Sequence, residues 1–447
     1  GRAAQRSAAV WQAGVIQVDT LDEMFDVAQV LAHQPLPRGN RIGVVGNSDA
    51  VALIVTDSAK SQGLQVAPPI TLSSSAGAEQ FEIAIENALL RPDIDALVVV
   101  YTPPVSTGGE EVADVLAAIG EQSDKPIVST FLASKGLPML LRVPDLQGGL
   151  AGRGSVPSYV APESAVKALA RVVNYAQWAA RDHGEYHIEL SYRTGDAKAL
   201  IREVLEIAPR GAVLSIEQVH FLLDCYGIDL LQWRNVHSLE EALEAGESFG
   251  WDVVLKAGSE HLRARPDLPH IWRGIHSAED MTQAWNGMST WPGMRADTSF
   301  FVQPSAPDGL QVAFKATEDR LFGPLISFGL AGAPSELLED RSYGIPPLTN
   351  VDAEAMVRGI RSAPLLFGYR GSEPVDVDAI QDIVLRLAAL KDDLPEVASL
   401  DLEPVAVGTD GYVALSARAK VVPSNEPRRD MHTRRLSEPV ALAETEQ

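Results

Sequence analysis

Residues 400–421 read LDLEPVAVGTDGYVALSARAKV, two runs of alternating apolar residues joined by an Asp-Gly pair. Asp-Gly between such runs is a strong short-range signal for a β-hairpin. If Asp410 and Gly411 form a two-residue loop, Glu403 lies directly opposite Arg418 on the second strand. The stretch therefore predicts two antiparallel strands in a defined register.

One face of this hairpin is expected to carry four polar side chains, because side chains alternate along a strand. They are Asp401, Glu403, Ser416 and Arg418. The two carboxylates offer the oxygen ligands that Mg²⁺ requires, so the face is a candidate metal site. Alternatively, Glu403 and Arg418 form a cross-strand ion pair, which stabilises a hairpin modestly. We favour the ion pair.

The chain before the hairpin alternates between buried strands and helices. Apolar runs are expected to form strands at 42–45, 96–104 and 125–133, and helical patterns occupy about 49–63 and 110–119. Strands that are apolar throughout and alternate with helices indicate a doubly wound parallel sheet. From about Ala197, helices and strands follow in a different order, which indicates a second domain.

Composition and charge limit the function classes. The 447 residues carry a formal net charge of -23, with a pI of about 4.8, which disfavours nucleic acid and anionic membranes as partners. An anionic ligand would need local positive charge or helix N-termini. Cys225 is the only cysteine, and no apolar run reaches the roughly 20 residues of a membrane span. We expect a cytoplasmic protein.

Several motifs follow one another in a recognisable order. They include LLDCYGI, WDVVLKA, FVQP, FGPLISFG, LLFGYRG and LPEVASLDLEPV. As an ordered set they resemble the ATP-grasp domain of NDP-forming acyl-CoA synthetases, such as the ADP-forming acetate–CoA ligases. Residues 11–45 and the LVVVYTPP run resemble the succinyl-CoA-ligase-like flavodoxin domain of the same family.

The resemblance implies an α/β chain with a flavodoxin-like doubly wound parallel sheet followed by an ATP-grasp α+β domain. We expect an N-terminally incomplete flavodoxin-like domain at 1–162, a helical linker at 163–196, the ATP-grasp domain at 197–422 and a flexible tail at 423–447. The chain begins without methionine inside a helical pattern, so we expect a fragment or a truncated gene product.

Members of this family make an acyl-CoA from an acid, CoA and ATP through an acyl phosphate, and a histidine carries phosphate between the two halves. The resemblance therefore implies ATP, Mg²⁺, and CoA or acyl-CoA as ligands. The family's Ser-His-Thr-Gly segment and its CoA-binding Rossmann domain are not in this sequence. A second shuttle position, after Lys256, is occupied by Ala264, and alanine cannot accept phosphate.

Five positions are candidates for contact with the nucleotide. Lys256 lies where the family's lysine reaches the phosphates, or it is a strand-end lysine that extends to water. Gln303 ends a strand at the family's adenine hinge, and Glu336 follows a turn that approaches the nucleotide. Asn47 and Ser48 belong to a strand-to-helix turn that either faces phosphate or forms an ordinary connection.

The metal ligands of the family are replaced. Its asparagine and aspartate correspond to Glu403 and Ser416, so Asp401 and Glu403 remain as candidate metal ligands. Gln311 stands where the family has glutamate, and Lys315 either contacts phosphate or faces solvent. Phosphoryl transfer depends on positioned charge and metal, so these changes predict weakened or lost turnover. We assign no catalytic residue.

Two hypotheses follow. The chain is an acyl-CoA-synthetase-like module that binds ATP and acyl-CoA with impaired phosphoryl transfer. Alternatively, it is a non-catalytic regulatory or sensor module, because related chains are fused to a GNAT protein acetyltransferase. Expected partners are small molecules, a second copy of the chain, and CoA-binding and acetyltransferase domains in a longer protein. A scaffold without ligand is the third option.

Overall fold

The computed structural model describes residues 12–103, 109–132, 141–142, 152–186, 191–257, 271–290, 300–319 and 323–424. Two compact units make up the chain. The N-terminal unit spans Ala13–Asp182, and the C-terminal unit comprises Gly1–Gln12 and His183–Gln447. The helix expected before Gly14 and the tail expected from residue 423 lie almost wholly outside the described residues.

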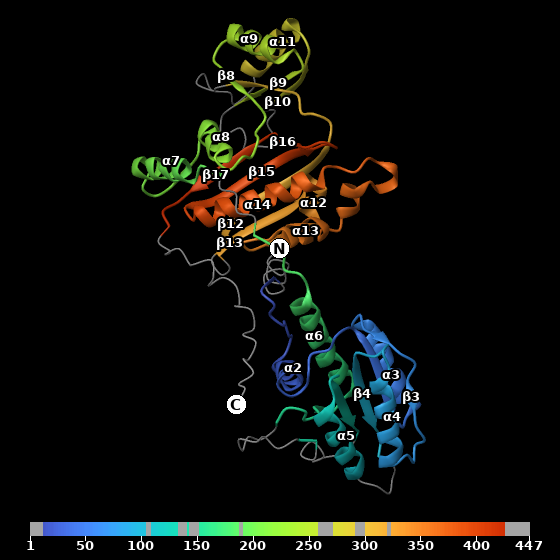
Figure 1. Ribbon diagram of the computed structural model, residues 1–447. Helices are drawn as coiled ribbons and strands as arrows, with labels where there is room; N and C mark the ends of the chain where they lie inside the picture. Colours follow the sequence, from blue (N-terminus) through green and yellow to red (C-terminus); the bar gives the residue numbers. More distant parts are fainter. Residues whose placement is uncertain are drawn as a thin grey trace. The chain divides into compact units, whose positions relative to one another are not determined.

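The N-terminal unit is built on a six-stranded parallel sheet (Figure 1). The strands are β1 (Arg41–Gly46), β2 (Gln65–Val66), β3 (Ile70–Thr71), β4 (Ala96–Tyr101), β5 (Ile127–Phe131) and β6 (Ser158–Tyr159). Their order is β2-β1-β4-β5-β6, with β3 also pairing with β1. This is the flavodoxin-like order, and it confirms the predicted doubly wound sheet.

Helices cover both faces of this sheet, because β4 and the residues of β1 after Arg41 are apolar and buried. They are α2 (Leu21–His33), α3 (Asp49–Ser61), α4 (Ala78–Leu90), α5 (Glu110–Gln122) and α6 (Pro162–Ala180). One core cluster joins α2, α3 and α6 to the sheet, and a second joins α4 and α5 to the opposite face. Alternate residues of one strand feed the two clusters, as Val44 and Val45 do.

Helix α6 lies where the sequence indicated a linker, and the structure corrects that interpretation. Its apolar stripe packs against α2 and α3, and Leu169 and Val172 are fully buried there. Proline at the first helical position starts the helix without losing a hydrogen bond. The helix is therefore part of the core of the N-terminal unit.

The C-terminal unit contains two sheets. The smaller is antiparallel, in the order β10-β9-β11-β8. Its strands are β8 (Arg234–Val236), β9 (Val253–Ala257), β10 (Ile271–Ile275) and β11 (Phe300–Pro304). Helices α9 (Leu239–Phe249) and α11 (Ala278–Ser289) pack on one face, around Val302 and Met281. Serine N-caps start both helices, at Ser238 and Ser277.

The larger sheet has seven strands, in the order β14-β13-β12-β15-β17-β7, with β16 paired to β15. The strands are β7 (Ala212–Val213), β12 (Leu310–Asp319), β13 (Gly323–Leu330), β14 (Arg341–Gly344), β15 (Val397–Val407), β16 (Tyr412–Ala414) and β17 (Ala417–Val421). The associated helices are α7 (Thr194–Ile207), α8 (Ile216–Asp224), α12 (Ala333–Leu337), α13 (Asn350–Arg358) and α14 (Val377–Asp393). Helices α7, α8, α13 and α14 share one core cluster with the sheet.

The hairpin register differs from the predicted one by two residues. Val407 pairs with Tyr412, so the loop has four residues, closed by a hydrogen bond from the Gly408 N–H to the Gly411 carbonyl. Arg418 therefore lies opposite Asp401, not opposite Glu403 as the two-residue loop required. A shift of two residues does not move a side chain to the other face, so the shared polar face is confirmed.

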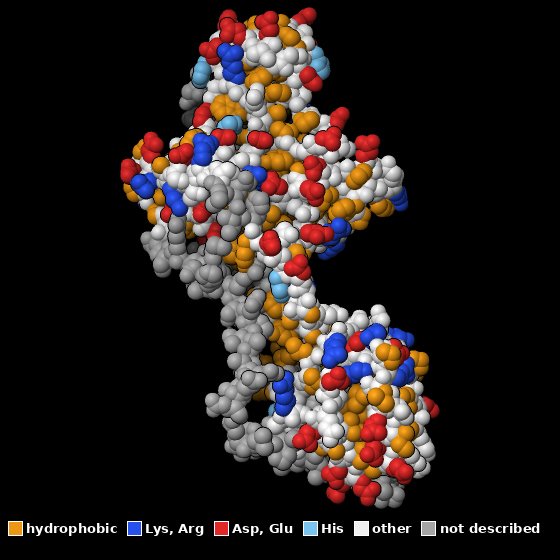
Figure 2. Space-filling model, viewed as in Figure 1, with side chains coloured by type: hydrophobic (Ala, Val, Ile, Leu, Met, Phe, Trp, Pro, Cys, Tyr) orange, Lys and Arg blue, Asp and Glu red, His pale blue; other side chains and the backbone are white. Residues whose placement is uncertain are grey.

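The surface of the described residues is strongly acidic. Figure 2 shows Asp and Glu side chains spread over the visible face of both units, as the net charge of -23 leads one to expect. None of the helices in the described ranges has the length and apolarity needed to span a membrane.

Candidate functional site

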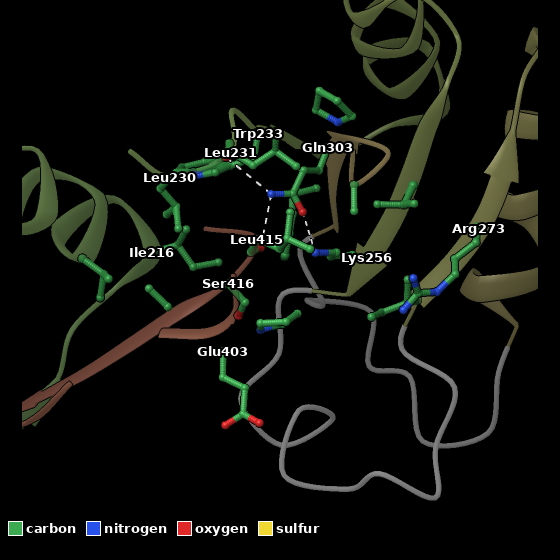
Figure 3. Close-up of a pocket in the computed structure, with 18 of the residues that line it drawn as sticks. Ile216, Leu230, Leu231, Trp233, Lys256, Arg273, Gln303, Glu403, Leu415 and Ser416 are labelled. Atoms are coloured by element: carbon green, nitrogen blue, oxygen red, sulfur yellow. Dashed lines mark hydrogen bonds between the residues drawn. The ribbon is translucent and has the colours of Figure 1, made fainter. Parts of the chain in front are cut away.

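A cavity of about 290 Å³ lies between the two sheets of the C-terminal unit (Figure 3). Strands β9, β10 and β11 of the small sheet and β12, β15 and β17 of the large sheet supply walls. The polar side chains on its lining are Lys256, Arg273, Gln303, Gln311, Glu403 and Ser416. The lining also has an apolar group, which includes Ile216, Leu230, Leu231, Trp233 and Val254. This combination suits a ligand with one flat apolar part and one charged part.

Lys256 is one of the cations on this lining. Its neighbours Val253, Val254, Leu255 and Ala257 on β9 are buried, whereas Lys256 itself is only half-buried. The ammonium Nζ lies 2.5 Å from Oε1 of Gln303 and 5.9 Å from the centre of the Phe301 ring. The lysine therefore lies along the cavity wall, where an anionic ligand would meet it.

Gln303 holds this lysine in place. Its side chain is 3% exposed, and its amide nitrogen donates to the carbonyls of Leu231 and Leu415, each at 3.4 Å. Its amide oxygen accepts from Lys256 (Figure 3). The side chain expected at an adenine hinge thus links β11 to two neighbouring segments through hydrogen bonds.

Asp401 and Glu403 are brought together, but with basic partners. Lys315 on β12 lies directly opposite Asp401 on β15. Its Nζ is 3.9 Å from Oδ1 of Asp401 and 3.8 Å from Oε2 of Glu403. A terminal nitrogen of Arg341, on β14, lies 3.9 Å from the same Glu403 oxygen. Glu403 is therefore paired with Lys315 and Arg341, and the predicted pair with Arg418 is wrong.

The electrostatics of Asp401 reflect its surroundings. Burial raises the pKa of the Asp401 carboxyl, and the nearby Glu403 carboxylate acts in the same direction. Lys315, Arg418 and Arg341 oppose this rise. The raised pKa of Asp401 means that burial and the second carboxylate together outweigh the stabilisation that three cations supply.

The donor set does not fit the magnesium site that the family implies. Mg²⁺ takes oxygen ligands in near-octahedral geometry and is usually held by one or two carboxylates. Here the two carboxylates share the ammonium of Lys315. Ser416, opposite Glu403 on the adjoining segment, offers only a neutral oxygen. Among the residues that the structure describes, no three His, Cys, Asp or Glu side chains form a group that could hold a metal ion.

Asn47 and Ser48 lie in the N-terminal unit, at the carboxyl end of β1. The Asn47 amide is 3% exposed and exchanges two hydrogen bonds of 2.8 Å with the backbone of Thr102, just beyond β4. Ser48 is the N-cap residue of α3 but makes no capping bond through its side chain. Asn47 thus ties together the ends of two adjacent strands.

Other predicted positions have different outcomes. The side chain of Glu336, on α12, and the shuttle segment containing Ala264 lie outside what the structure describes. Sequence reasoning did not identify Arg273 or Arg341. Arg341 reaches the site from β14, far along the chain from the hairpin, so no local pattern could indicate it. The sequence predicts that Lys315 contacts phosphate or faces solvent, and its pairing with Asp401 depends on the register of β12 against β15.

Comparisons with known proteins agree with this architecture. A profile of the ATP-grasp domain matches residues 207–421. The beta subunit of ADP-forming acetate–CoA ligase II from Pyrococcus furiosus is 32% identical over 234 residues, which are 51% of this chain and 98% of that subunit. The ADP-forming acetate–CoA ligase I of Archaeoglobus fulgidus is 26% identical over 437 residues, 92% of this chain and 61% of that enzyme.

A solved structure is also similar. It is the dinucleotide-forming acetyl-coenzyme A synthetase 1 of Ca. Korarchaeum cryptofilum in complex with coenzyme A, Ca-AMPCP and HgCl⁺. It is 29% identical, has a TM-score of 0.46, and covers 51% of this chain and 100% of that one.

Fold and site together define a chain with a flavodoxin-like parallel sheet and an ATP-grasp domain. The chain belongs to the family of ADP-forming acetate–CoA ligases. It spans about three fifths of the length of the Archaeoglobus enzyme.

Proposed function

We propose that this chain is an acyl-CoA-synthetase-like module that binds ATP in the cavity between the two sheets of its C-terminal unit. Lys256 contacts the phosphates, and the apolar group around Trp233 receives the adenine. Gln303 and Glu336 complete the nucleotide site. CoA or acyl-CoA is a further ligand, by analogy with the acetate–CoA ligases that the chain matches.

The observation that carries this proposal is the placement of Lys256. A lysine in the middle of an apolar strand is costly unless its ammonium has a use, and this one lies on a cavity wall with its Nζ against Gln303. A point cation suits phosphate oxygens. Arg273, on the neighbouring strand β10, adds a second positive charge to the same lining.

We further propose that phosphoryl transfer in this chain is weakened or lost. The two positions where the family binds metal hold Glu403 and Ser416, and Ala264 stands at the shuttle histidine. Glu403 is engaged by Lys315 and Arg341. Rapid phosphoryl transfer needs metal and precisely placed charge, so binding can survive these changes while chemistry does not.

The alternative is a regulatory or sensor module, for which an acetyltransferase fusion is the proposed context. The pairing of Lys315 with both carboxylates favours it, because that arrangement retains ligand-binding charge without a metal site. Formation of acyl phosphate or ADP by the full-length protein would support the synthetase. Ligand binding without turnover would support the sensor.

Thermal melting with and without ATP tests the nucleotide site. ATP at about 100 times its Kd adds about 2.7 kcal/mol to the free energy of unfolding. For a unit of this size, we expect the melting temperature to rise by about 5–10 °C. Lys256→Ala removes a charged hydrogen-bond donor to phosphate, so the shift should fall to about half or less at the same ATP concentration. The measurement is made both with Mg²⁺ and with EDTA.

Lys420→Ala is the matched control. Lys420 is an exposed lysine on β17, opposite Ser399 and Val213, and the substitution changes the net charge by the same amount. Its ATP-dependent shift should equal that of the wild type. No shift for the wild type at millimolar ATP, in either condition, would reject the nucleotide site and leave the scaffold interpretation.

A further inference from the structure

The carboxylate pair at the edge of the cavity already has a cation between its members. Lys315 and Asp401 lie opposite each other on β12 and β15, so their side chains leave the sheet on one face. The Lys315 Nζ is almost equidistant from the two carboxylates, at 3.9 Å from Asp401 and 3.8 Å from Glu403. Glu403 also lines the cavity that Lys256 lines.

A second cation reaches Glu403 from β14 at the edge of the sheet, on the same face as Lys315. Arg341 on β14 lies opposite Gly329 on β13, and Gly329 lies opposite Ala313 on β12. A Cβ atom at position 329 would come within 3.1 Å of the Arg341 side chain. Glycine at this position therefore leaves room for the arginine stem to pass over β13 toward β12 and β15. The side chain is 11% exposed, and its Nη2 lies 3.9 Å from Glu403.

Arg341 retains donor capacity. Its Nη1 atom is buried and has no hydrogen-bond partner among the described residues. A guanidinium offers five donors in a fixed planar arrangement that matches phosphate oxygens. Leaving one of these groups without a partner is costly, and an anionic oxygen would remove that cost.

The balance of charge favours an anion over a second cation. Lys315, Arg341 and Arg418, which lies opposite Asp401, carry three positive charges against the two negative charges of Asp401 and Glu403. A divalent ion placed between the carboxylates would have to displace the ammonium of Lys315. A phosphate would meet a site that is already positive, within a chain whose net charge is -23.

We propose that the ammonium of Lys315, supported by Arg341, replaces the divalent cation at Asp401 and Glu403, so that the polyphosphate of a nucleotide binds this cavity without metal. The inference rests on the nucleotide site proposed above and specifies its ligand as the free, metal-free polyphosphate anion. An ammonium can hold phosphate by charge, but it cannot polarise a phosphoryl oxygen as Mg²⁺ does. The same substitution therefore retains binding and impairs transfer.

Calorimetric titration of ATP into the intact chain, once with EDTA and once with excess Mg²⁺, tests the inference. We expect the two dissociation constants to agree within about threefold, a difference of less than 1 kcal/mol. Binding that is tenfold or more tighter with Mg²⁺ would overturn the inference. Absence of binding in both conditions would overturn the proposed nucleotide site itself, and metal-free binding with it.

The Lys315→Gln variant provides the second arm. Without the ammonium, affinity in EDTA should fall about tenfold, the effect of losing one charge-assisted contact. Added Mg²⁺ should restore it, because the two carboxylates are then free to bind metal. Lys420→Gln, on the same sheet, should behave as the wild type. A Lys315→Gln variant that binds ATP as the wild type does in EDTA would contradict the role of Lys315.

A measurement without nucleotide distinguishes failure of the proposed nucleotide site from failure of the proposed role of Lys315. Mn²⁺ binding followed by electron paramagnetic resonance should detect no tightly bound ion on the wild type and one on Lys315→Gln. This outcome concerns only the position of the ammonium, so it stands even if ATP fails to bind. Mn²⁺ binding by the wild type that Lys315→Gln leaves unchanged would show that the carboxylates are available to metal and reject the replacement. A melting curve of the apo variant confirms that it is folded.

Discussion

Single side chains decide what this cavity can bind, because each one sets the sign of the charge that a ligand meets there. A glutamate at position 403 in place of the family's neutral asparagine would by itself strengthen the binding of a cation. The presence of Lys315 and Arg341 beside Glu403 reverses that effect. Knowledge of one position therefore does not predict the function of the site, and the hairpin sequence alone could not reveal it. Lys315 and Arg341 lie beside Glu403 only because of the register of β12 against β15 and the position of Arg341 on β14.

The ion pair between Arg41 and Asp95 gives a prediction for how the stability of the N-terminal unit depends on pH. The Arg41 guanidinium donates to both oxygens of Asp95, at 2.8 and 2.7 Å, and lowers the pKa of Asp95 below its ordinary value of 3.8, although burial opposes this. A carboxyl whose pKa is lowered by folding stabilises the fold above its unfolded pKa. That contribution is lost as the pH falls through the folded pKa. Stability should therefore fall with acid below about pH 4.

Asp95→Asn tests this directly. It should lower the free energy of unfolding at pH 7 by about 1.5–3 kcal/mol, the range for hydrogen bonds to a charged group. It should also make the free energy of unfolding fall less steeply with acid, as measured by urea unfolding between pH 7 and pH 3. Asp124→Asn is the control, since Asp124 pairs with Arg38 at 3.3 Å on the exposed surface. Equal effects of the two substitutions would contradict the argument.

At the scale of elements, the sequence predicted which strands form better than it predicted the loops that join them. Buried apolar runs identified β1, β4 and β5, because strands covered on both faces have a simple signature. The hairpin loop was predicted two residues too short. The N–H of Gly408 bonds to Gly411, and the carbonyl of Gly408 accepts from Asp376 at the start of α14. That second bond comes from tertiary structure, which a local turn rule does not include.

The linker interpretation of α6 failed for a related reason. An amphipathic helix has the same pattern whether it lies between domains or packs on a sheet. Leu169→Ala separates the two cases, since Leu169 is fully buried in α6. We expect a loss of about 2–5 kcal/mol in the free energy of unfolding of the N-terminal unit, measured by urea denaturation. Leu90→Ala, at an 81% exposed leucine on α4, should change it little.

At the scale of the whole molecule, the two-domain order and the ATP-grasp architecture could be predicted because an ordered set of motifs spans both units. The composition of the site could not. Arg273, Arg341 and Lys315 converge on the site from three strands of two sheets, and only the fold brings them together. The acidic surface has the opposite sign to this local charge, so total charge alone would have misjudged the ligand.

The single cysteine reports on the whole C-terminal unit. Cys225 is 2% exposed at the end of α8, within the core that includes β12 and α14, and burial raises the pKa of its thiol. Native labelling by a thiol reagent should therefore require unfolding and proceed slowly. A ligand that binds only the folded state slows such labelling by a factor of 1 + [L]/Kd, about elevenfold at ten times Kd.

ATP without metal should produce this protection in the wild type and in Lys420→Ala, and fail to produce it in Lys256→Ala. Labelling followed by absorbance, at one pH so that the thiolate fraction stays constant, measures it. Rapid labelling of the apo protein would mean that Cys225 is reached by local opening, and the buried core around α8 would then be less closed than the structure describes. Slow labelling that ATP leaves unchanged would mean that ATP does not bind the folded C-terminal unit, because binding to any site in it must protect its core by mass action.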